Sequence, residues 1–371
     1  DFAKAFDSVV HEKLILKLRN VGIEGLSLLW ISAFLKNRTQ SVKIKNSLSD
    51  QLSVSSGVPQ GSVLGPTLFN IFINDLVDYI EYSDIYLFAD DVKLFSENPT
   101  QLQSDLLNFT EWAYKWQLEI SVKKCCVLHL GSNNPNVDYT LGNTVLSSQR
   151  IVKDLGLHIS DKLSFTSHCN ALFQKCSRIS SLICKTFLSK DLNLKLKAFK
   201  ANVVPILDYC SSIYNPYKIS DIELIERVQR KFTKQILWHE NLTYENRLQR
   251  LNLQPLEVRR IMFDLSLFYK IIKNQIPGFS ENIKIKDSKT ITRSSCKTII
   301  DIPKHRLDIM KYSFFIRTAK IWNSLPFSVT QSRSIKAFQK SLATVDLSPY
   351  TRGATKCSFQ PSRTHDVAMT I

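Results

Sequence analysis

The chain has 371 residues, of which 44% are hydrophobic and 22% charged. This length suggests two or three domains as a prior, and the composition is globular, not disordered or fibrous. No apolar run of about 18 residues occurs, which excludes an obvious membrane span. Eight cysteines without a C-x-x-C spacing indicate reduced intracellular thiols and no zinc site.

The chain begins at Asp1, with no initiator Met and no secretory leader. We therefore expect a fragment of a longer protein, located in the nucleus or the cytoplasm and without a membrane partner.

Charge is distributed unevenly along the chain. Residues 1–150 hold 13 Lys and Arg against 16 Asp and Glu, a net charge of −3, whereas residues 151–371 hold 36 against 17, a net charge of +19. A strongly basic second part indicates a polyanionic partner such as nucleic acid. The alternative is a solvated, lysine-rich surface without a specific partner.

The first elements in chain order are two helices and two strands. Apolar residues at spacings of three and four predict helices over 9–20 and 25–36, with Gly22 as a stop signal between them. Polar and apolar residues alternate over 40–45 and 51–54, which predicts strands.

A glycine-rich turn and an apolar hairpin follow. The turn covers 56–62, after which Pro66 opens an apolar segment, 67–79, that we predict to be a buried helix. Two short apolar runs, 85–88 and 92–95, flank an acidic pair and predict a hairpin.

The order of elements favours an α+β fold. A helix is expected over 100–117, a strand over 125–130 and a loop over 131–138. Strands and helices are thus mixed and include a hairpin, which argues against a doubly wound parallel sheet.

Beyond about residue 165 the helical period dominates, with helices expected over 193–214, 222–237 and 256–273. Four basic residues lie off the apolar stripe of the second of these and are candidates for nucleic-acid binding: Arg227, Arg230, Lys231 and Lys234. Polarity rises over 281–311, a packed element returns near 314–322, and the end of the chain is expected to be a weakly ordered tail.

The acidic pair Asp90 and Asp91 lies between the two apolar strands of the predicted hairpin. Burial of two like charges costs several kcal/mol, on the order of the penalty for any unpaired ion, unless a cation compensates. The pair is therefore a candidate divalent-metal site, and Mg²⁺ prefers oxygen ligands of this kind.

Three blocks in order carry a specific resemblance. They are Asp1-Phe-Ala-Lys-Ala-Phe-Asp7, then Ser56-Gly-Val-Pro-Gln-Gly-Ser-Val-Leu-Gly-Pro-Thr-Leu-Phe69, then Phe88-Ala-Asp-Asp91. Together they resemble the reverse transcriptase of non-LTR (LINE-type) retrotransposons, and most closely the Jockey and chicken-repeat relatives. Weaker matching blocks extend the resemblance to about residue 345, among them 118–126, 153–159, 204–210, 226–230 and 322–326.

The resemblance implies a right-hand polymerase. Residues 1–159 would form the palm, an antiparallel sheet packed on helices. A mostly helical thumb or connection region would cover 160–280, and a basic C-terminal region with a partly disordered tail would cover 281–371. The implied activity is RNA-directed DNA polymerisation, in which a dNTP is added to a primer 3′-hydroxyl on an RNA template, with DNA as primer and target.

The resemblance also implies a metal site. Asp1, Asp90 and Asp91 match the three carboxylates that hold two Mg²⁺ ions in the family, with Mn²⁺ as a possible replacement. Phe2 matches the residue that lends its backbone carbonyl to a metal. All four are thus expected to converge on one face of the palm.

Three further residues match positions near the incoming nucleotide in the family. Phe6 matches the aromatic residue beneath the sugar that rejects a 2′-hydroxyl, and Gln60 matches a glutamine near the nucleotide and template. Lys124 matches the lysine proposed to protonate the pyrophosphate. The residue before the acidic pair is often Tyr in the family, whereas Phe88 stands here.

The fingers and the upstream endonuclease of the family have no counterpart in these 371 residues, so we expect the chain alone to be weakly active or inactive. A degenerate or co-opted remnant that binds nucleic acid without catalysis is the first alternative. A group II intron maturase, which shares the palm, is a weaker one.

Overall fold

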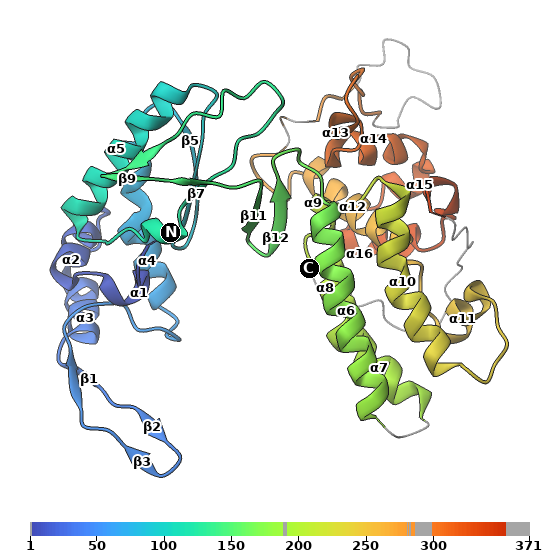
Figure 1. The fold of residues 1–371 in the computed structure, drawn as a ribbon, viewed down its shortest axis with the longest axis horizontal. Helices are drawn as coiled ribbons and strands as arrows, with labels where there is room; N and C mark the ends of the chain where they lie inside the picture. The colour runs from blue at the N-terminus through green and yellow to red at the C-terminus, as the bar shows by residue number, and fades with distance from the viewer. Residues whose placement is uncertain (1, 188–190, 280, 282, 286–298, 354–371) are drawn as a thin grey trace. The chain divides into compact units, whose positions relative to one another are not determined.

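The computed structural model describes residues 2–187, 191–279, 281, 283–285 and 299–353. The chain divides into two compact units, Asp1–Val152 (unit 1) and Lys153–Ile371 (unit 2) (Figure 1). Each unit has its own hydrophobic core and is described separately.

The helices of unit 1 largely follow the predicted pattern. They are α1 (Ala5–Ser8), α2 (His11–Asn20), α3 (Gly25–Leu35), α4 (Gly65–Ile73), the 3₁₀ helix η1 (Asn74–Tyr79), α5 (Pro99–Trp116) and the 3₁₀ helix η2 (Val122–Lys124). Asn98 caps α5 by accepting hydrogen bonds from the backbone N–H groups of Thr100 and Gln101. The predicted single helix over 67–79 is corrected, because its second half is the tighter helix η1.

The strands of unit 1 are short and pair two by two among the described residues. The antiparallel pairs are β1 (Arg38–Gln40) with β4 (Leu52–Val54), β2 (Lys43–Ile44) with β3 (Ser47–Leu48), β5 (Asp84–Phe88) with β6 (Asp91–Phe95), and β8 (Thr140–Leu141) with β9 (Thr144–Val145). A parallel pair joins β7 (Cys126–Val127) to β10 (Ser147–Ser148). The strand predicted over 125–130 is thus reduced to β7.

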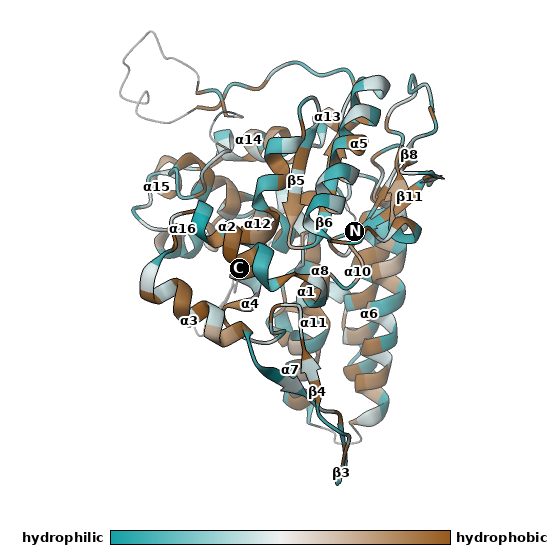
Figure 2. Cartoon of the chain, turned by 90° about the vertical axis from the view of Figure 1, so that its left-hand side faces the viewer, coloured by the Kyte–Doolittle hydropathy of each residue, from teal (hydrophilic) through white to brown (hydrophobic). Residues whose placement is uncertain are grey.

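One hydrophobic core joins the helices of unit 1 to its hairpins. Large side chains from α4, from α5 and from the segment before α1 meet in it and are buried, including Phe2, Phe69, Phe72 and Trp112. Helix α3 is apolar around most of its circumference (Figure 2), and its outer face stays exposed.

Unit 2 is mainly helical. Its elements are β11 (Ile151–Asp154), which straddles the boundary and pairs with β12 (Leu157–Ser160), and the helices α6 (Thr166–Thr186), α7 (Leu192–Asn202), α8 (Val204–Asp208), α9 (Ser211–Tyr214), α10 (Ile219–Ile236), α11 (Tyr244–Leu251), α12 (Leu256–Ile272), α13 (Asp308–Lys311), α14 (Phe314–Ser324), α15 (Phe327–Thr330), α16 (Ile335–Leu342) and the 3₁₀ helix η4 (Ser348–Tyr350). The helix predicted over 193–214 is wrong as a single element. It breaks where Pro205 starts α8 and where Cys210 adopts a positive φ of 52°.

Helix α12 is the centre of unit 2. Most of its side chains are buried, and it packs against α9, α10, α14 and α16. Aromatic contacts hold two of these interfaces, with ring centroids 5.6 Å apart for Phe268 and Trp322 and 4.6 Å apart for Tyr269 and Phe338.

No helix within the described part of the chain combines the length and the apolar character that a membrane span requires. Two predicted regions lie partly outside the described residues. They are the tail, of which residues 354–371 are not described, and the polar stretch from 281, of which residues 282 and 286–298 are not described.

Candidate active site

The acidic pair occupies the turn of the β5–β6 hairpin. Phe88 pairs with Asp91 in the strand register, so Ala89 and Asp90 form a two-residue turn and Asp91 begins β6. Ala89 has a φ of 51°, a left-handed conformation that costs an L-residue about 1 kcal/mol or more. Both carboxylates are half-buried. The hairpin therefore presents two adjacent carboxylates at its end, on a strained turn.

One face of this hairpin is anchored in the core of unit 1. Ile85, Leu87 and Val92 pack against the buried cluster that contains Phe2. The alternate residues of β5 face outward, and Phe88 is 63% exposed. The acidic turn thus extends from a hairpin whose orientation is fixed by apolar contacts on one side only.

Phe2 is a core residue whose backbone lies beside the segment after α5. Its ring lies 5.6 Å from that of Phe109, centroid to centroid, and it is 1% exposed. Phe2 forms an antiparallel bridge with Ile120, and the backbone N–H of Ala3 donates to the carbonyl of Glu119 at 2.8 Å. Any ligand contact of Phe2 must therefore come from its backbone.

The first and second sequence blocks are joined by hydrogen bonds. The backbone N–H of Val58 donates to the carbonyl of Phe6 at 2.7 Å, and Gln60 Nε2 donates to Asp7 Oδ1 at 3.1 Å. The Phe6 ring stacks on Phe69, with centroids 4.5 Å apart. The structure thus brings together Phe6 and Gln60, two of the residues predicted to lie near the nucleotide.

Gly57 is required for this junction. Its φ is +88°, and an added Cβ would lie 2.7 Å from the Cα of Asp7, closer than real Cβ atoms approach. Its carbonyl accepts a hydrogen bond from His11 Nε2 at 2.8 Å. The glycine therefore allows the second block to lie directly against the first.

The remaining predicted site residues are placed as follows. Asp1 lies outside the described residues. Lys124 is exposed at the end of η2. No group of three or more His, Cys, Asp or Glu that could hold a metal ion occurs among the described residues. Asp90 and Asp91 supply adjacent carboxylate oxygens, the donor type that suits Mg²⁺. Because Asp1 is not described, the metal site that it would share with them stays a prediction.

A buried lysine in the core of unit 1 was not foreseen from the sequence. Lys17 Nζ lies 2.6 Å from Asp75 Oδ1 and 3.6 Å from the centroid of the Trp116 ring. Burial lowers the pKa of Lys17 to about 8, against the opposing hydrogen bond and charge of Asp75. The available signal was a lysine within the apolar stripe of Leu14 and Leu18 in α2.

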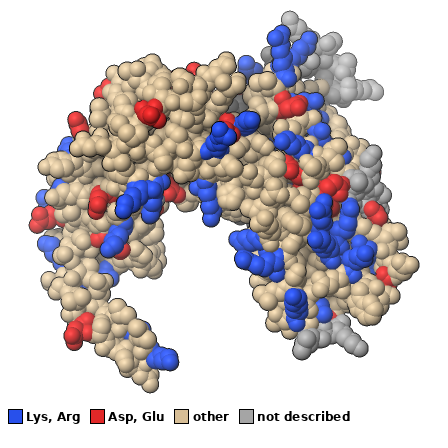
Figure 3. Space-filling model, viewed as in Figure 1, with Lys and Arg blue, Asp and Glu red and all other residues tan. Residues whose placement is uncertain are grey.

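The four basic residues predicted on α10 do not share one environment. Arg227, Lys231 and Lys234 are exposed, and the first two approach the ring of Phe173 in α6. Arg230 is half-buried, lies 3.5 Å from Glu223 and contacts the ring of Tyr244. We call Arg227, Lys231 and Lys234 the α10 basic face. Figure 3 shows Lys and Arg gathered over α6, α7 and α10 of unit 2.

Unit 2 also contains an open groove of about 560 Å³ between the β11–β12 pair, α6 and α8. Lys153, Lys175 and two histidines line it, together with Tyr209. His168 is buried, and its Nδ1 lies 3.4 Å from the backbone nitrogen of His158. Burial, aided by His158, lowers the pKa of His168 to about 4, so this ring is neutral at pH 7.

Comparison with known proteins agrees with the resemblance found in the three sequence blocks. Residues 1–159 match the family model described as "Reverse transcriptase (RNA-dependent DNA polymerase)". The matched range holds every predicted metal and nucleotide residue.

The relatives are products of mobile elements. The chain is 29% identical over 257 residues to the "RNA-directed DNA polymerase from mobile element jockey" of Drosophila melanogaster, and 30% identical over 253 residues to that of Drosophila funebris. It is 26% identical over 260 residues to the "Probable RNA-directed DNA polymerase from transposon BS" of Drosophila melanogaster. Each match covers 64% of this chain and 28% of the relative. The chain thus spans under a third of these relatives, and the resemblance stated from the sequence is confirmed.

Proposed function

We propose, from the premise that residues 1–159 are a reverse transcriptase domain related to those of non-LTR retrotransposons, that this chain is the core of an RNA-directed DNA polymerase. It would transfer a nucleotide from a dNTP to a primer 3′-hydroxyl on an RNA template. Residues 1–159 would serve as the palm. Residues 160–280 would serve as thumb, followed by the basic C-terminal region.

The observation that carries the proposal is the packing of the three sequence blocks around one core. Gln60 of the second block contacts Asp7 of the first, and the hairpin with the acidic turn packs on the same buried cluster as Phe2. Residues separated by up to 90 positions in the sequence are thus joined in one unit. An unrelated combination of a tight turn, a hairpin and a helix start would have no reason to share a core.

The residues fit a divalent-metal mechanism through the chemistry of their donors. Asp90, Asp91 and Asp1 would hold the ions through carboxylate oxygens, and Phe2 would add its backbone carbonyl. Two Mg²⁺ ions, or Mn²⁺ in their place, would supply charge neutralisation at the attacking hydroxyl and at the pyrophosphate.

The neighbouring side chains would position the reactants. Phe6, held by its stack on Phe69, would lie beneath the sugar and leave no room for a 2′-hydroxyl. Gln60 would orient the nucleotide and template from the Gly57 turn. The primer 3′-hydroxyl would lose its proton to water, and its oxygen would form a bond to the α-phosphorus while the bond to pyrophosphate breaks. Lys124 would donate a proton to the leaving pyrophosphate and regain one from solvent.

Unit 2 would hold the template and primer. Its net charge of +19 and the α10 basic face suit a phosphate backbone, and the groove lined by Lys153 and Lys175 adds a second basic surface. Base-reading contacts are not required, so this binding would be largely independent of sequence. No membrane partner is proposed, and the site of action would be the nucleus or the cytoplasm.

The test is primer extension on an RNA template by the chain alone and by the chain grafted into the corresponding segment of the jockey polymerase. Asp90→Asn and Asp91→Asn remove a ligand charge and keep the shape, so each should reduce extension by at least 100-fold. Asp84→Asn, at the far end of the same hairpin, is the matched control and should leave extension unchanged. Activity of either turn variant within tenfold of the parent would contradict the proposal.

The alternative, a remnant that binds nucleic acid without catalysis, predicts a different outcome of the same test. The graft would be inactive with all three carboxylates intact, while the chain would still bind template and primer.

A further inference from the structure

A stack of two tyrosines lies on unit 2 and involves residues that the proposed function does not use. The rings of Tyr217 and Tyr312 are nearly parallel, with an angle of 5° and centroids 4.7 Å apart. The guanidinium carbon of Arg352 lies 4.4 Å from the Tyr312 centroid. Two rings this close leave no space for another group between them, so Arg352 lies outside the pair. Both tyrosines are partly exposed, and Arg352 is exposed.

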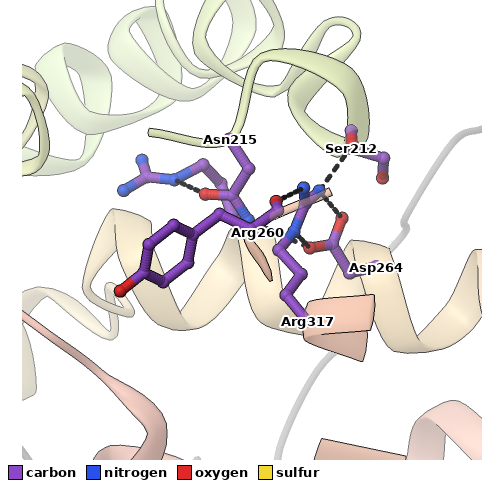
Figure 4. Close-up of polar contacts among 6 residues, drawn as sticks. Ser212, Asn215, Arg260, Asp264 and Arg317 are labelled. Atoms are coloured by element: carbon purple, nitrogen blue, oxygen red, sulfur yellow. Dashed lines mark hydrogen bonds and ion pairs between the residues drawn. The ribbon is translucent and has the colours of Figure 1, made fainter. Parts of the chain in front are cut away.

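A buried polar network holds the two segments that carry these rings (Figure 4). Arg317 donates from Nε to Asp264 Oδ2 at 2.8 Å and from Nη1 to the carbonyl of Tyr312 at 2.9 Å. Asn215, two residues before Tyr217, donates from Nδ2 to Asp264 Oδ2 at 2.9 Å. Asp264 is 2% exposed. The buried Asp264 carboxylate thereby links the segment of Tyr217 to that of Tyr312, and these hydrogen bonds hold the two rings in position.

The third member of the stack is fixed independently. The backbone N–H groups of Arg352 and Gly353 donate to the two oxygens of Glu257, at 2.8 and 3.0 Å. Glu257 belongs to α12, the same helix as Asp264. The Glu257 carboxylate therefore binds backbone N–H groups of this segment, while the guanidinium of Arg352 contacts the Tyr312 ring.

The surroundings of the stack are cationic. Lys218 and Lys311 follow and precede the two tyrosines in the sequence, and both are exposed. Lys311 Nζ lies 5.2 Å from the Tyr312 centroid. Hydrogen bonds from Arg352 and Lys311 lower the pKa of Tyr312, against a rise from burial. Among the described residues, neither lysine nor Arg352 forms an ion pair, so no carboxylate there neutralises the three charges.

We propose that Tyr217, Tyr312 and Arg352, with Lys218 and Lys311, form a binding site for single-stranded nucleic acid, in which an unpaired base stacks on the Tyr217 ring and the lysines bind the flanking phosphates. Tyr217 is partly exposed, and Tyr312 is its one aromatic partner among the described residues, so the proposal places the base on the ring face that has no aromatic neighbour there. Aromatic and cationic groups side by side are the combination that binds single strands without sequence preference. The ligand class rests on the proposed function, but none of these five residues belongs to the predicted polymerase site.

The test compares two ligands that differ only in their bases. Fluorescence anisotropy measures the affinity of the full chain for a single-stranded oligonucleotide and for an abasic oligonucleotide of the same length and charge. Tyr217→Leu should weaken binding of the base-containing strand about 5- to 100-fold and leave binding of the abasic strand unchanged. Tyr217→Phe, which keeps the ring, should bind like the parent. Tyr114→Leu, at a tyrosine of α5 that is 88% exposed, is the matched control.

A second readout uses the unaltered chain and so does not depend on the folding of a variant. An oligonucleotide that contains 4-thiouridine is cross-linked by light, and mass spectrometry identifies the attached peptides. Adducts at Tyr217 or Tyr312 are expected. Adducts only elsewhere, or equal weakening of both ligands by Tyr217→Leu, would overturn the site. Because both readouts measure binding, an inactive polymerase would leave this result intact.

Discussion

The two units differ in how many acidic residues they bury. Unit 1 is nearly neutral, presents Asp90 and Asp91 together at a half-exposed turn and buries one acidic side chain, Asp105, among its described residues. Unit 2 has a net charge of +19, yet it buries four acidic side chains, Asp221, Glu226, Glu257 and Asp264.

The comparison shows that composition alone underestimates how basic the surface of unit 2 is. Among the described residues of unit 2, four carboxylates are withdrawn from the surface, whereas Arg247 and Arg260 are the only buried Lys or Arg side chains. Burial of acids inside a basic unit removes counter-charges from its surface, which favours a polyanionic ligand. In unit 1 the exposed acids instead favour a cation.

The strongest effect on stability is expected in the buried network of unit 2. Asp264→Asn removes the charge that pairs with Arg317, so this largely buried arginine loses its partner, and it also weakens the acceptor of Asn215, which in turn holds Arg260. We expect a loss of about 3–5 kcal/mol in the free energy of unfolding, measured by chemical denaturation. The matched control is Asp208→Asn, which breaks the more exposed pair with Arg259. An equal loss in both variants would show that burial of the carboxylate is not decisive.

A smaller loss is expected at the junction in unit 1. Gly57→Ala combines a positive φ with a Cβ placed 2.7 Å from the Asp7 backbone, and we expect a loss of about 2–4 kcal/mol. Gly61→Ala shares the positive φ of +82° but meets no atom within 4 Å, so it should lose only about 1 kcal/mol. Thermal denaturation of both variants separates close contact from backbone strain. Equal destabilisation would remove the close-contact argument.

A pH-dependent effect is expected from Lys17. Its pKa falls from 10.5 to about 8 on folding, so the unfolded chain binds more protons between these values and stability rises with pH across this window. Relative to Lys17→Met, which does not titrate, the parent should gain about 1–2 kcal/mol between pH 8 and 10.5, with allowance for solvent screening. The measurement is urea denaturation of both proteins at several pH values. A difference that stays constant with pH would contradict the assignment.

The smallest effect concerns the salt dependence of binding. Replacement of Arg227, Lys231 and Lys234 by Gln should reduce the log–log salt slope of template–primer binding by about 2–3 units, since each phosphate contact contributes about 0.7–0.9. Arg230→Gln should change it by much less, because Arg230 pairs with Glu223 and Tyr244. An unchanged slope in the triple variant would place the contacts elsewhere. A reduction of the salt slope by Arg230→Gln as large as that of the triple variant would contradict the separation of Arg230 from the α10 basic face.

The sequence allowed prediction where local rules decide the structure. The hairpin with Asp90 at its turn, the helix start at Pro66 and the glycine turn at Gly57 follow from residues within a few positions. The long strand expected after Lys124 and the single helix across Pro205 were wrong. The first depends on strand partners that the sequence does not reveal, and the second on a proline whose effect the helical period concealed.

The polar interior of unit 2 could not be predicted at all. Asp264 and Arg317 are 53 positions apart, and Tyr217 and Tyr312 are 95 apart. No periodicity links residues at such separations, so their contacts emerge only from the packing of α12 against α9 and α14. A lysine in an apolar stripe, as at Lys17, is a signal that future sequence analysis can use.

The central claim is that unit 1 carries the chemistry and unit 2 holds the nucleic acid. Single-turnover primer extension by the jockey graft, with the template–primer concentration varied, separates the rate at saturation from the apparent Kd. Asp90→Asn should lower the rate at least 100-fold with the Kd unchanged within about threefold. The triple Gln variant of the α10 basic face should raise the Kd at least tenfold with the rate unchanged. A rise in Kd for Asp90→Asn with a normal rate at saturation, or a loss of rate for the α10 variant that saturation does not restore, would contradict this division.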